Sequence, residues 1–514
     1  MIRLGRIMRN NGSFTDFFDK SSETLGPICQ IKLGPFAHMV VITDYLEIEN
    51  LLLRRHQSLD RSSYTVNLFK GILPKALLTL KTDEIWRHHR KLLSTTMTPK
   101  FLRTVNPNIT RSAEELVKLW QEKSKLANGR SFEAELDLES ATMDAICGIA
   151  LGENWNIISG YTSKLSHCTE YSSRDAVIED GKRNEIRFRL EAPELAESVW
   201  YIFNTVPLQN PFPSLTHYFI SLSPTYKKHI KRIENFLKQK IREARSKASR
   251  FSPNVAEDMA NNTLDLVIAK ELGNDHKISD EEIKQELFQY LLAGTETSST
   301  TLAWWCKYMT NNPSVQRKLR DHLQDKIPDY KEQGLNYDNL SPSNVPYLEA
   351  VVHETLRIAR TAGGYLRDTK EDVIILGHYI PKGTTLAFPT STGYQDNDSS
   401  YSNENQQDNR DRRVGYWQSG TGHLFDPERW LDEEGQFNAT AGPSLPFSLG
   451  QRRCFGKNLA LLELRVFIAH LNLAFFFAPI PQNLNGFERF DKIISHPKDC
   501  FIRPVSWDSE EVNL

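Results

Sequence analysis

Cysteine is scarce in this chain, and charge of one sign does not accumulate in it. The 514 residues include only 6 cysteines, and the formal net charge is −2. Because the cysteines are not clustered, they do not form a disulfide framework, and a reducing compartment is the natural interpretation. The near-neutral charge gives no signal for binding to nucleic acid, so we expect no nucleic-acid partner.

The beginning of the sequence lacks a long apolar run. Residues 1–24 are polar, and they include Arg3, Arg6 and Arg9. This segment contains neither the roughly 20 apolar residues that span a bilayer nor the apolar core of a secretory signal. Two interpretations stay open: the protein has no anchor, or the anchor is missing from this sequence.

Apolar residues are also nearly absent from residues 390–413, which are rich in Asn, Asp, Ser and Gln. A segment of this composition cannot bury enough surface to offset the entropy that it loses on ordering. Loops of this length are uncommon inside compact domains. We interpret 390–413 as a mobile surface insertion, or as a misannotated intron.

One cysteine lies in a sequence that suits a metal ligand. Pro446–Gly456 reads PFSLGQRRCFG, and an apolar helix is expected directly after it. Gly450 and Gly456 have no Cβ, which lets the backbone run close to the sulfur of Cys454, and Phe447 would shield that sulfur from solvent. An axial thiolate of this kind pushes electron density onto haem iron and favours O–O cleavage. The other cysteines are interpreted as small buried hydrophobic residues.

The segment Phe447–Gly456 resembles the haem-binding signature of the cytochrome P-450 monooxygenases. It matches at the phenylalanine, the glycine, the arginine two before the cysteine, the cysteine and the glycine two after it. The resemblance implies a mainly α fold with small β-sheets (α+β), in which haem b lies between a long central helix and the helix after Cys454. It also implies that the Cys454 thiolate binds the iron and that Arg452 binds a haem propionate.

A second motif is ETLR at 354–357. Glu354 and Arg357 are three residues apart on one helix face and can form an ion pair. Taken alone, such a pair usually lies on the surface and is worth little. The resemblance implies instead a buried structural pair, completed by Arg429 from the later FDPERW loop, that holds the loop carrying the cysteine.

A third motif is AGTETS at 293–298, inside residues 279–311, which read as one long helix. Glycine, threonine and serine are poor choices for a helix interior, and a threonine hydroxyl can bond back to a carbonyl one turn earlier and loosen the helix. A sequence that merely tolerates a kink is the simpler interpretation. The resemblance implies that Glu296 and Thr297 form an acid–alcohol pair that delivers protons during oxygen activation.

A fourth motif is WRHHR at 86–90. Trp86 and Arg90 are four residues apart and share a helix face, and the resemblance assigns both to a haem propionate. His88 and His89 are adjacent, cannot converge on one metal position, and are expected to face solvent. Arg367 stands where the family often places another propionate-binding arginine.

The rest of the sequence pattern predicts the remaining helices and strands and the organisation into domains. Residues 200–224 are rich in aromatic residues and proline, and core packing, a lid for a lipophilic substrate and a patch that dips into a membrane are all open. We expect one haem-thiolate catalytic domain at 25–505 and a C-terminal tail at 506–514. Strands are expected at 28–33 and 37–42, and helices at 44–55, 108–124, 137–151 and 226–250.

The resemblance implies an oxidoreductase that inserts one oxygen atom of O2 into a lipophilic small molecule. The chain has no flavin or nicotinamide fingerprint, so its electrons are expected to come from a separate reductase. The resemblance implies that this partner is an NADPH–cytochrome reductase, with cytochrome b5 as a further donor. Candidate reductase contacts are Arg87, Lys91, Arg453 and Lys457. Residues 62–80 are expected to lie over the haem and to line part of the substrate pocket.

Substrate and location stay open. The motifs resemble those of filamentous-fungal members, many of which tailor secondary metabolites, but a hydroxylase of fatty acids, sterols or xenobiotics would use the same motifs. Haem-thiolate isomerases, dehydratases and haem-binding sensors fit less well, because they do not need Glu296 and Thr297. If an anchor is missing from this sequence, the cytoplasmic face of the endoplasmic reticulum is the expected location, with peripheral membrane contact; otherwise the protein is cytoplasmic.

Overall fold

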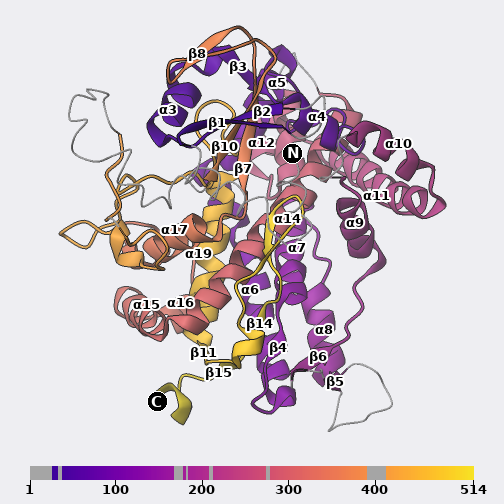
Figure 1. Cartoon of the computed structure of the whole chain (residues 1–514). Helices are drawn as coiled ribbons and strands as arrows, with labels where there is room; N and C mark the ends of the chain where they lie inside the picture. The colour runs from indigo at the N-terminus through magenta and orange to yellow at the C-terminus, as the bar shows by residue number, and fades with distance from the viewer. Residues whose placement is uncertain are drawn as a thin grey trace. The chain divides into compact units, whose positions relative to one another are not determined.

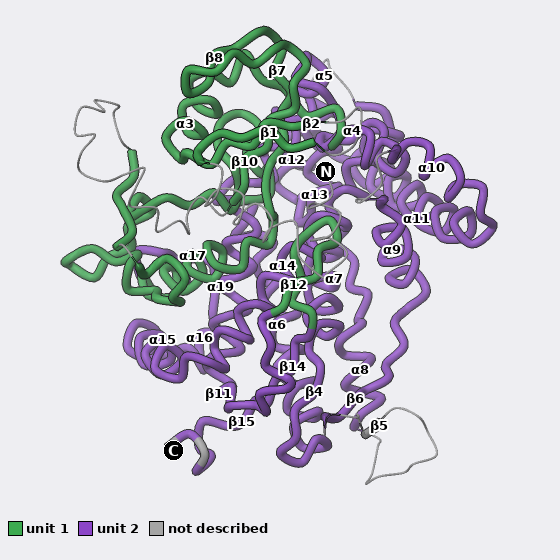
Figure 2. The backbone as a smooth tube through the Cα atoms, viewed as in Figure 1, with its two compact units in different colours: residues 1–65, 345–457, 488–498 green, residues 66–344, 458–487, 499–514 purple. Residues whose placement is uncertain are grey.

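The computed structural model describes most of the chain (Figure 1). The described residues are 26–32, 38–166, 178–180, 183, 185–207, 212–273, 278–390, 413–418 and 420–513. The chain forms two compact units (Figure 2): unit 1 comprises residues 1–65, 345–457 and 488–498, and unit 2 comprises residues 66–344, 458–487 and 499–514. The predicted segment 1–24 and the predicted insertion 390–413, except for its two end residues, lie outside the described residues.

Unit 1 is built on a five-stranded mixed sheet in the order β1-β2-β10-β7-β3. β1 runs antiparallel to β2, which confirms the two predicted strands, and β10 pairs parallel with β2 and antiparallel with β7. Val40, Ile42, Leu386 and Phe388 alternate along β2 and β10 and so fall on one buried face. The strands are β1 (Ile28–Lys32), β2 (His38–Ile42), β3 (Leu59–Arg61), β7 (Gly364–Thr369) and β10 (Thr385–Pro389).

Short helices and hairpins complete unit 1. Asp44 accepts a hydrogen bond of 2.6 Å from the backbone N–H of Glu47 and so caps α3. The helix predicted at 44–55 continues beyond α3 as the π-helix η1. The elements are α3 (Tyr45–Glu49), η1 (Asn50–Arg54), η2 (His56–Ser58), α17 (Pro346–Ala359), β8 (Val373–Ile375), β9 (His378–Ile380), η6 (Pro427–Trp430), β12 (Arg489–Asp491) and β13 (Ser495–Pro497).

Unit 2 is mainly helical, and α7 (Glu135–Leu151) packs between α6 (Pro99–Ala127) and α14 (Asp280–Asn311) at its centre (Figure 1). α7 is buried along nearly its whole length. A Cβ at Gly294 of α14 would lie 2.7 Å from Cδ1 of Ile146 in α7. Glycine at this position therefore permits the close packing of the two helices.

Local capping fixes where α14 begins. Ser279 and Glu282 form a capping box, in which each side chain bonds to the backbone N–H of the other. The helices predicted at 137–151, 226–250 and 279–311 are confirmed, within a few residues at their ends, in α7, α11 and α14. The helix predicted at 108–124 is part of α6, which begins nine residues earlier, at Pro99, and continues through Pro107.

The remaining elements of unit 2 are short helices and strands. β14, β4, β6 and β5 form a four-stranded sheet in that order. α4 (Ser63–Phe69) and α19 (Lys457–Ala474) each begin in residues of unit 1 and end in residues of unit 2. The others are α5 (Glu84–Leu93), η3 (Ser94–Met97), β4 (Phe132–Glu133), α8 (Ile157–Ser166), β5 (Ile178–Asp180), β6 (Ile186–Phe188), α9 (Glu194–Asn204), α10 (Pro213–Leu222), α11 (Pro224–Ala248), α12 (Pro253–Asp258), α13 (Thr263–Leu272), α15 (Pro313–Lys326), α16 (Tyr330–Gln333), β11 (Phe476–Phe477), η7 (Gln482–Leu484), β14 (Phe501–Ile502), β15 (Pro504–Val505) and η8 (Glu510–Asn513).

Helices dominate this architecture, and the sheets are small. The expected fold class, mainly α with small β-sheets, is therefore confirmed. Within the part of the chain that the structure describes, none of the helices combines the length and the hydropathy needed to cross a bilayer.

Candidate active site

Cys454 lies in a tight loop of unit 1 that its own backbone closes. The N–H of Cys454 donates to the carbonyl oxygen of Phe447 at 2.8 Å. The hydroxyl of Tyr365 on β7 donates to the carbonyl oxygen of Pro446, which ties the start of the loop to the sheet. The Cys454 side chain is exposed, so its sulfur is accessible to a ligand.

Gly450 fixes the path of this loop. Its φ is +71°, in the left-handed region that favours glycine. A Cβ at this position would lie 2.0 Å from the carbonyl oxygen of Leu52 in η1, so the contact excludes a larger residue. Gly456 differs, because a Cβ there would meet no atom of the described residues within 4 Å. The surrounding protein therefore leaves room only for glycine at position 450, whereas it does not require glycine at position 456.

Three arginines gather beside the loop in unit 1. Arg367 of β7 pairs across strands with Arg61 of β3 and donates at 3.3 Å to the carbonyl oxygen of Arg452. Arg452 lies 3.6 Å from the carboxylate of Asp60. Burial of Arg367, reinforced by the charge of Arg61, lowers the pKa of its guanidinium to about 9. A buried cluster of cations favours binding of an anionic group, because the anion would offset the repulsion.

Glu354 and Arg357 of α17 form a buried bidentate pair in unit 1. Two guanidinium nitrogens of Arg357 donate to the two oxygens of Glu354 at 2.7 and 2.8 Å. Nε of Arg429 donates to the same carboxylate at 3.1 Å. The indole N–H of Trp430 and the backbone N–H of Asp426 also donate to it. The structure thus brings the three predicted structural residues together, and their contacts join α17 to η6.

Glu296 and Thr297 lie in the middle of α14 in unit 2. Glu296 is buried and Thr297 is exposed. The Thr297 hydroxyl donates to the carbonyl oxygen of Ala293 at 2.7 Å, and Thr295 bonds back one turn in the same way at 2.8 Å. These are the back-bonds that the sequence predicts, yet α14 continues as an α-helix along its whole length.

A second acidic side chain packs against this motif within unit 2. The Ser298 hydroxyl donates to the carboxyl group of Glu463 on α19 at 2.5 Å, and both residues are buried. Burial raises the pKa of Glu463 to about 8, although the hydrogen bond from Ser298 opposes the rise. Glu463 is therefore largely protonated at neutral pH.

The helix α5 carries the fourth motif, also in unit 2. Trp86 is buried and Arg90 is half-buried. The expectation that His88 and His89 face solvent is wrong for His89, which is only 1% exposed. Nδ1 of His89 lies 2.8 Å from a carboxylate oxygen of Glu286 on α14. The face of α5 that carries His89 is covered by α14. A buried imidazole needs a hydrogen-bond partner, and the carboxylate of Glu286 provides it.

Sequence reasoning missed several of these residues. Arg61 meets Arg367 only through the register of β3 and β7, and Glu286 meets His89 only through helix packing, so neither gave a local signal. Glu463 did give a local signal in the sequence, because it is an acidic residue inside the apolar run that follows Cys454. An acid in such a run indicates a buried polar partner.

Comparison with known proteins decides the family. The cytochrome P-450 family model matches residues 3–403 and 420–502. The chain belongs to the cytochrome P-450 family. The unmatched stretch between the two ranges overlaps the predicted insertion at 390–413.

Individual relatives of this cytochrome P-450 include fungal monooxygenases. A cytochrome P-450 monooxygenase of Pestalotiopsis microspora is 30% identical over 501 residues, which cover 93% of this chain and 86% of that protein. The cytochrome P-450 monooxygenase TRI13 of Fusarium sporotrichioides is 28% identical over 93% of this chain and 87% of its own. The Hps1-dma1 cluster cytochrome P-450 monooxygenase cyp3.1 of Dothistroma septosporum is 33% identical over 43% of this chain and 77% of its own.

Membership of the family establishes the class of chemistry. The protein is a monooxygenase, an oxidoreductase that uses O2, and its cofactor is haem with thiolate-bound iron. The residues present fit this cofactor, because Cys454 offers an exposed sulfur and the cluster of Arg61, Arg367 and Arg452 offers cations for a propionate. The predicted residues fall in both units: those of the cysteine loop and Arg367 belong to unit 1, and Trp86, Arg90, Glu296 and Thr297 belong to unit 2.

Proposed function

We propose that the Cys454 thiolate is the axial ligand of the haem iron. The observation that carries this assignment is the exposed Cys454 side chain in a loop whose path Gly450 fixes through its positive φ and its contact with Leu52. Phe447, whose carbonyl oxygen accepts the Cys454 N–H, is the residue proposed to shield the sulfur. When bound, the haem supplies the activation of dioxygen.

The haem propionates are assigned to basic side chains in both units. In unit 1, Arg367 and Arg452 donate to a propionate, with Arg61 beside them. A propionate carboxylate would offset the repulsion that, together with burial, lowers the pKa of Arg367. In unit 2, Trp86 and Arg90 of α5 are assigned to a propionate by their match to the family motif.

Glu296 and Thr297 are the proposed catalytic pair. The Thr297 hydroxyl is exposed on α14, and its bond to the Ala293 carbonyl orients the oxygen and its proton. The carboxyl group of Glu296, one residue earlier, is buried and is assigned as the acid of the pair. Together they would hold and move protons during the activation of dioxygen by the bound haem.

The proposed substrate is a lipophilic small molecule, and the reaction is a tailoring step in fungal secondary metabolism. The support is the set of fungal relatives, one of which is named for a gene cluster. Hydroxylation of a fatty acid, sterol or xenobiotic is the alternative.

Electrons are proposed to come from an NADPH–cytochrome reductase, with cytochrome b5 as a further donor. Of the candidate contacts, Arg87, Lys91 and Arg453 are exposed and so accessible to a partner. Lys457 is half-buried, and burial lowers the pKa of its ammonium group, so it is the weakest of the four.

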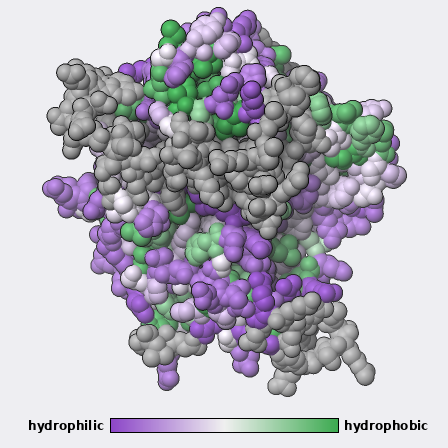
Figure 3. Space-filling view, in the orientation of Figure 1, coloured by the Kyte–Doolittle hydropathy of each residue, from purple (hydrophilic) through white to green (hydrophobic). Residues whose placement is uncertain are grey.

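Peripheral membrane contact is proposed for α10, on the cytoplasmic face of the endoplasmic reticulum. Figure 3 shows apolar surface over this helix. The aromatic residues predicted at 200–224 do not all pack in the core, and α11, which packs on α10, is basic. An apolar face beside basic residues suits an anionic lipid surface. The exposed apolar residues are Phe212, Leu215, Tyr218, Phe219 and Leu222, and the exposed lysines are Lys227, Lys228 and Lys231.

The absorption spectrum of the dithionite-reduced protein under carbon monoxide tests the assignment of Cys454. We expect a strongly red-shifted Soret band in the unsubstituted protein and its loss in Cys454→Ser. Cys29→Ser changes a cysteine on β1 and is the matched control, expected to keep the band. A band that persists in Cys454→Ser would refute the proposal.

A further inference from the structure

Within unit 2, hydrogen bonds to its main chain hold the segment between α4 and α5 against α14. The backbone N–H of Leu77 donates to Oε1 of Glu286 at 2.8 Å, and the next N–H, of Leu78, donates to Oε1 of Gln289 at 2.7 Å. Glu286 and Gln289 are three residues apart on α14 and so lie on one face of that helix. Two consecutive peptide groups are therefore fixed by side chains from one helix.

Glu286 also joins this segment to α5. Its Oε1 is the atom that lies 2.8 Å from Nδ1 of His89, and Nε2 of His89 is 3.7 Å from Glu282 one turn earlier on α14. Burial raises the pKa of Glu286, and the contact with His89 opposes the rise. One buried carboxyl group thus links three parts of the chain, namely α14, α5 and the residues around Leu77.

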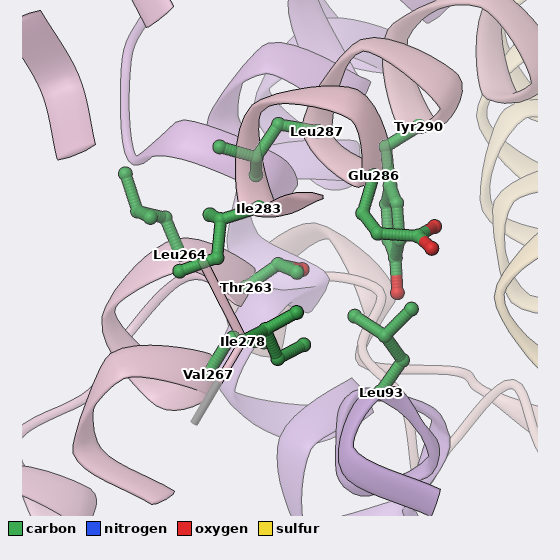
Figure 4. Close-up of a pocket in the computed structure, with 9 residues that line it drawn as sticks. All are labelled: Leu93, Thr263, Leu264, Val267, Ile278, Ile283, Glu286, Leu287 and Tyr290. Carbon is green, nitrogen blue, oxygen red and sulfur yellow. The ribbon is translucent and has the colours of Figure 1, made fainter. Parts of the chain in front are cut away.

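Glu286 also lines a small pocket, although its carboxyl group points away from the apolar side chains of that pocket (Figure 4). The pocket is lined mainly by apolar side chains, including Leu264, Ile283 and Leu287, and Tyr290 lies beside Glu286. Oε2 has no hydrogen-bond partner among the described residues. Leaving a buried acceptor without a bond costs free energy, so the bonds that hold Glu286 in place are those that its other oxygen makes.

The same segment is anchored at its other end by α10. A ring nitrogen of His217 lies 3.0 Å from the carbonyl oxygen of Leu68. A Cβ at Gly71 would lie 2.6 Å from the His217 ring, so the backbone passes directly against it. Between these anchors, the Thr79 hydroxyl donates to the carbonyl oxygen of Leu73 at 2.5 Å. This bond closes the turn, so the segment is expected to move as one piece.

We propose that Glu286 and Gln289 are positioning residues that hold residues 70–80 by their backbone and so strengthen the binding of ligands large enough to touch this segment. The inference rests on the proposed function, because it takes residues 62–80 as part of the wall of the substrate pocket. The anchors bind peptide groups and leave the half-buried side chains of Leu78 and Leu80 available to contact a ligand. Freeing the segment adds an ordering cost to the binding of any ligand that touches it.

Hydrogen–deuterium exchange of the haem-loaded protein tests the anchoring. Gln289→Ala removes one acceptor from a half-buried position and is expected to speed exchange in residues 70–80 by about tenfold, the equivalent of one hydrogen bond. Glu286→Gln keeps the shape and loses the charge, so a smaller increase is expected at the same residues. Glu433→Gln, the same change at an exposed carboxylate, is the control.

Ligand binding tests the consequence. Imidazole and clotrimazole both bind haem iron through a nitrogen, but only clotrimazole carries three bulky aromatic rings. In Gln289→Ala we expect the dissociation constant of clotrimazole to rise about fivefold, because the segment must be ordered on binding. That of imidazole should not change, since it is too small to reach the wall.

Each outcome separates this inference from the proposed function. Faster exchange confined to residues 70–80, with weaker clotrimazole binding alone, supports it. The inference is overturned if exchange is unchanged in both variants or rises throughout the chain. It is also overturned if clotrimazole and imidazole lose affinity equally. Absence of the red-shifted carbon monoxide band from the unsubstituted protein would refute the proposed function, and the exchange measurement would still decide whether Glu286 and Gln289 hold the segment.

Discussion

Ser298 of α14 donates a hydrogen bond to the buried carboxyl group of Glu463 on α19 at 2.5 Å. Burial raises the pKa of this carboxyl group from the ordinary value of 4.5 to about 8. The folded protein therefore keeps a proton on Glu463 over a range of pH in which the unfolded chain has lost it. Since the folded state binds more protons, the free energy of unfolding falls as the pH rises from about 4.5 to about 8.

Glu463→Gln should remove this pH dependence. The amide is uncharged at every pH and can still accept the Ser298 hydrogen bond. Near pH 5 the two proteins should have similar stability, and near pH 8 the variant should be more stable by about 2–4 kcal/mol. Urea unfolding at the two pH values measures the difference. The exposed Glu433→Gln is the control, and a parallel pH dependence in wild type and Glu463→Gln would contradict the assignment.

Arg367→Gln should weaken haem retention. It removes a buried guanidinium that we assign to a propionate, and a charge-assisted hydrogen bond contributes about 1.5–3 kcal/mol. Transfer of haem to excess apomyoglobin is expected to become at least about tenfold faster. Arg103→Gln, which disrupts an exposed pair with Asp338, should leave the rate unchanged. Equal rates for wild type and Arg367→Gln would argue against the propionate assignment.

Glu354→Gln should destabilise the fold. The substitution leaves Arg357 and Arg429 buried without their counter-charge, and breaking a buried ion pair costs about 3–5 kcal/mol. Asp338→Asn breaks a pair exposed to solvent and should cost less than about 1 kcal/mol. Thermal unfolding followed by circular dichroism compares the two. A loss for Glu354→Gln no greater than that for Asp338→Asn would show that the trio is not structural.

Gly450→Ala should distort the cysteine loop while leaving the helices intact. Alanine disfavours the positive φ, and its Cβ would collide with the Leu52 carbonyl oxygen. We expect loss of the red-shifted carbon monoxide band with little change in helix content. Gly160→Ala lies in α8, where a Cβ would meet none of the described residues within 4 Å, and should keep the band. A normal band in Gly450→Ala would mean that the loop tolerates another path.

Local patterns predicted well those features that depend on residues close in the sequence. The 32 residues of α14 begin at Asp280, directly after the N-cap Ser279, and Ser279 and Glu282 have the spacing of a capping box. Glu354 and Arg357 were predicted as a pair because their spacing alone places them on one helix face. The same holds for the back-bonds of Thr295 and Thr297, since each reaches one turn along its own helix.

Local spacing misled where a neighbouring helix decides the environment. His89 was expected to face solvent because adjacent histidines on a helix cannot converge on one metal position, yet its ring nitrogens lie close to Glu286 and Glu282 of α14. Gly294 was interpreted through its weak helix propensity, but its place in the structure is explained by the approach of Ile146. In both cases the deciding atoms lie far away in the sequence.

The sequence by itself determined the chemistry of the cysteine loop, the long helix that carries Glu296 and Thr297, and the family to which they belong, because these depend on residue types at short, fixed spacings. Only the tertiary structure decided that Arg61 lies beside Arg367, that Glu463 keeps its proton, and that Glu286 holds the backbone at Leu77. Strand register and helix packing bring these groups together, and burial then sets their pKa values and bonds, which no local pattern encodes.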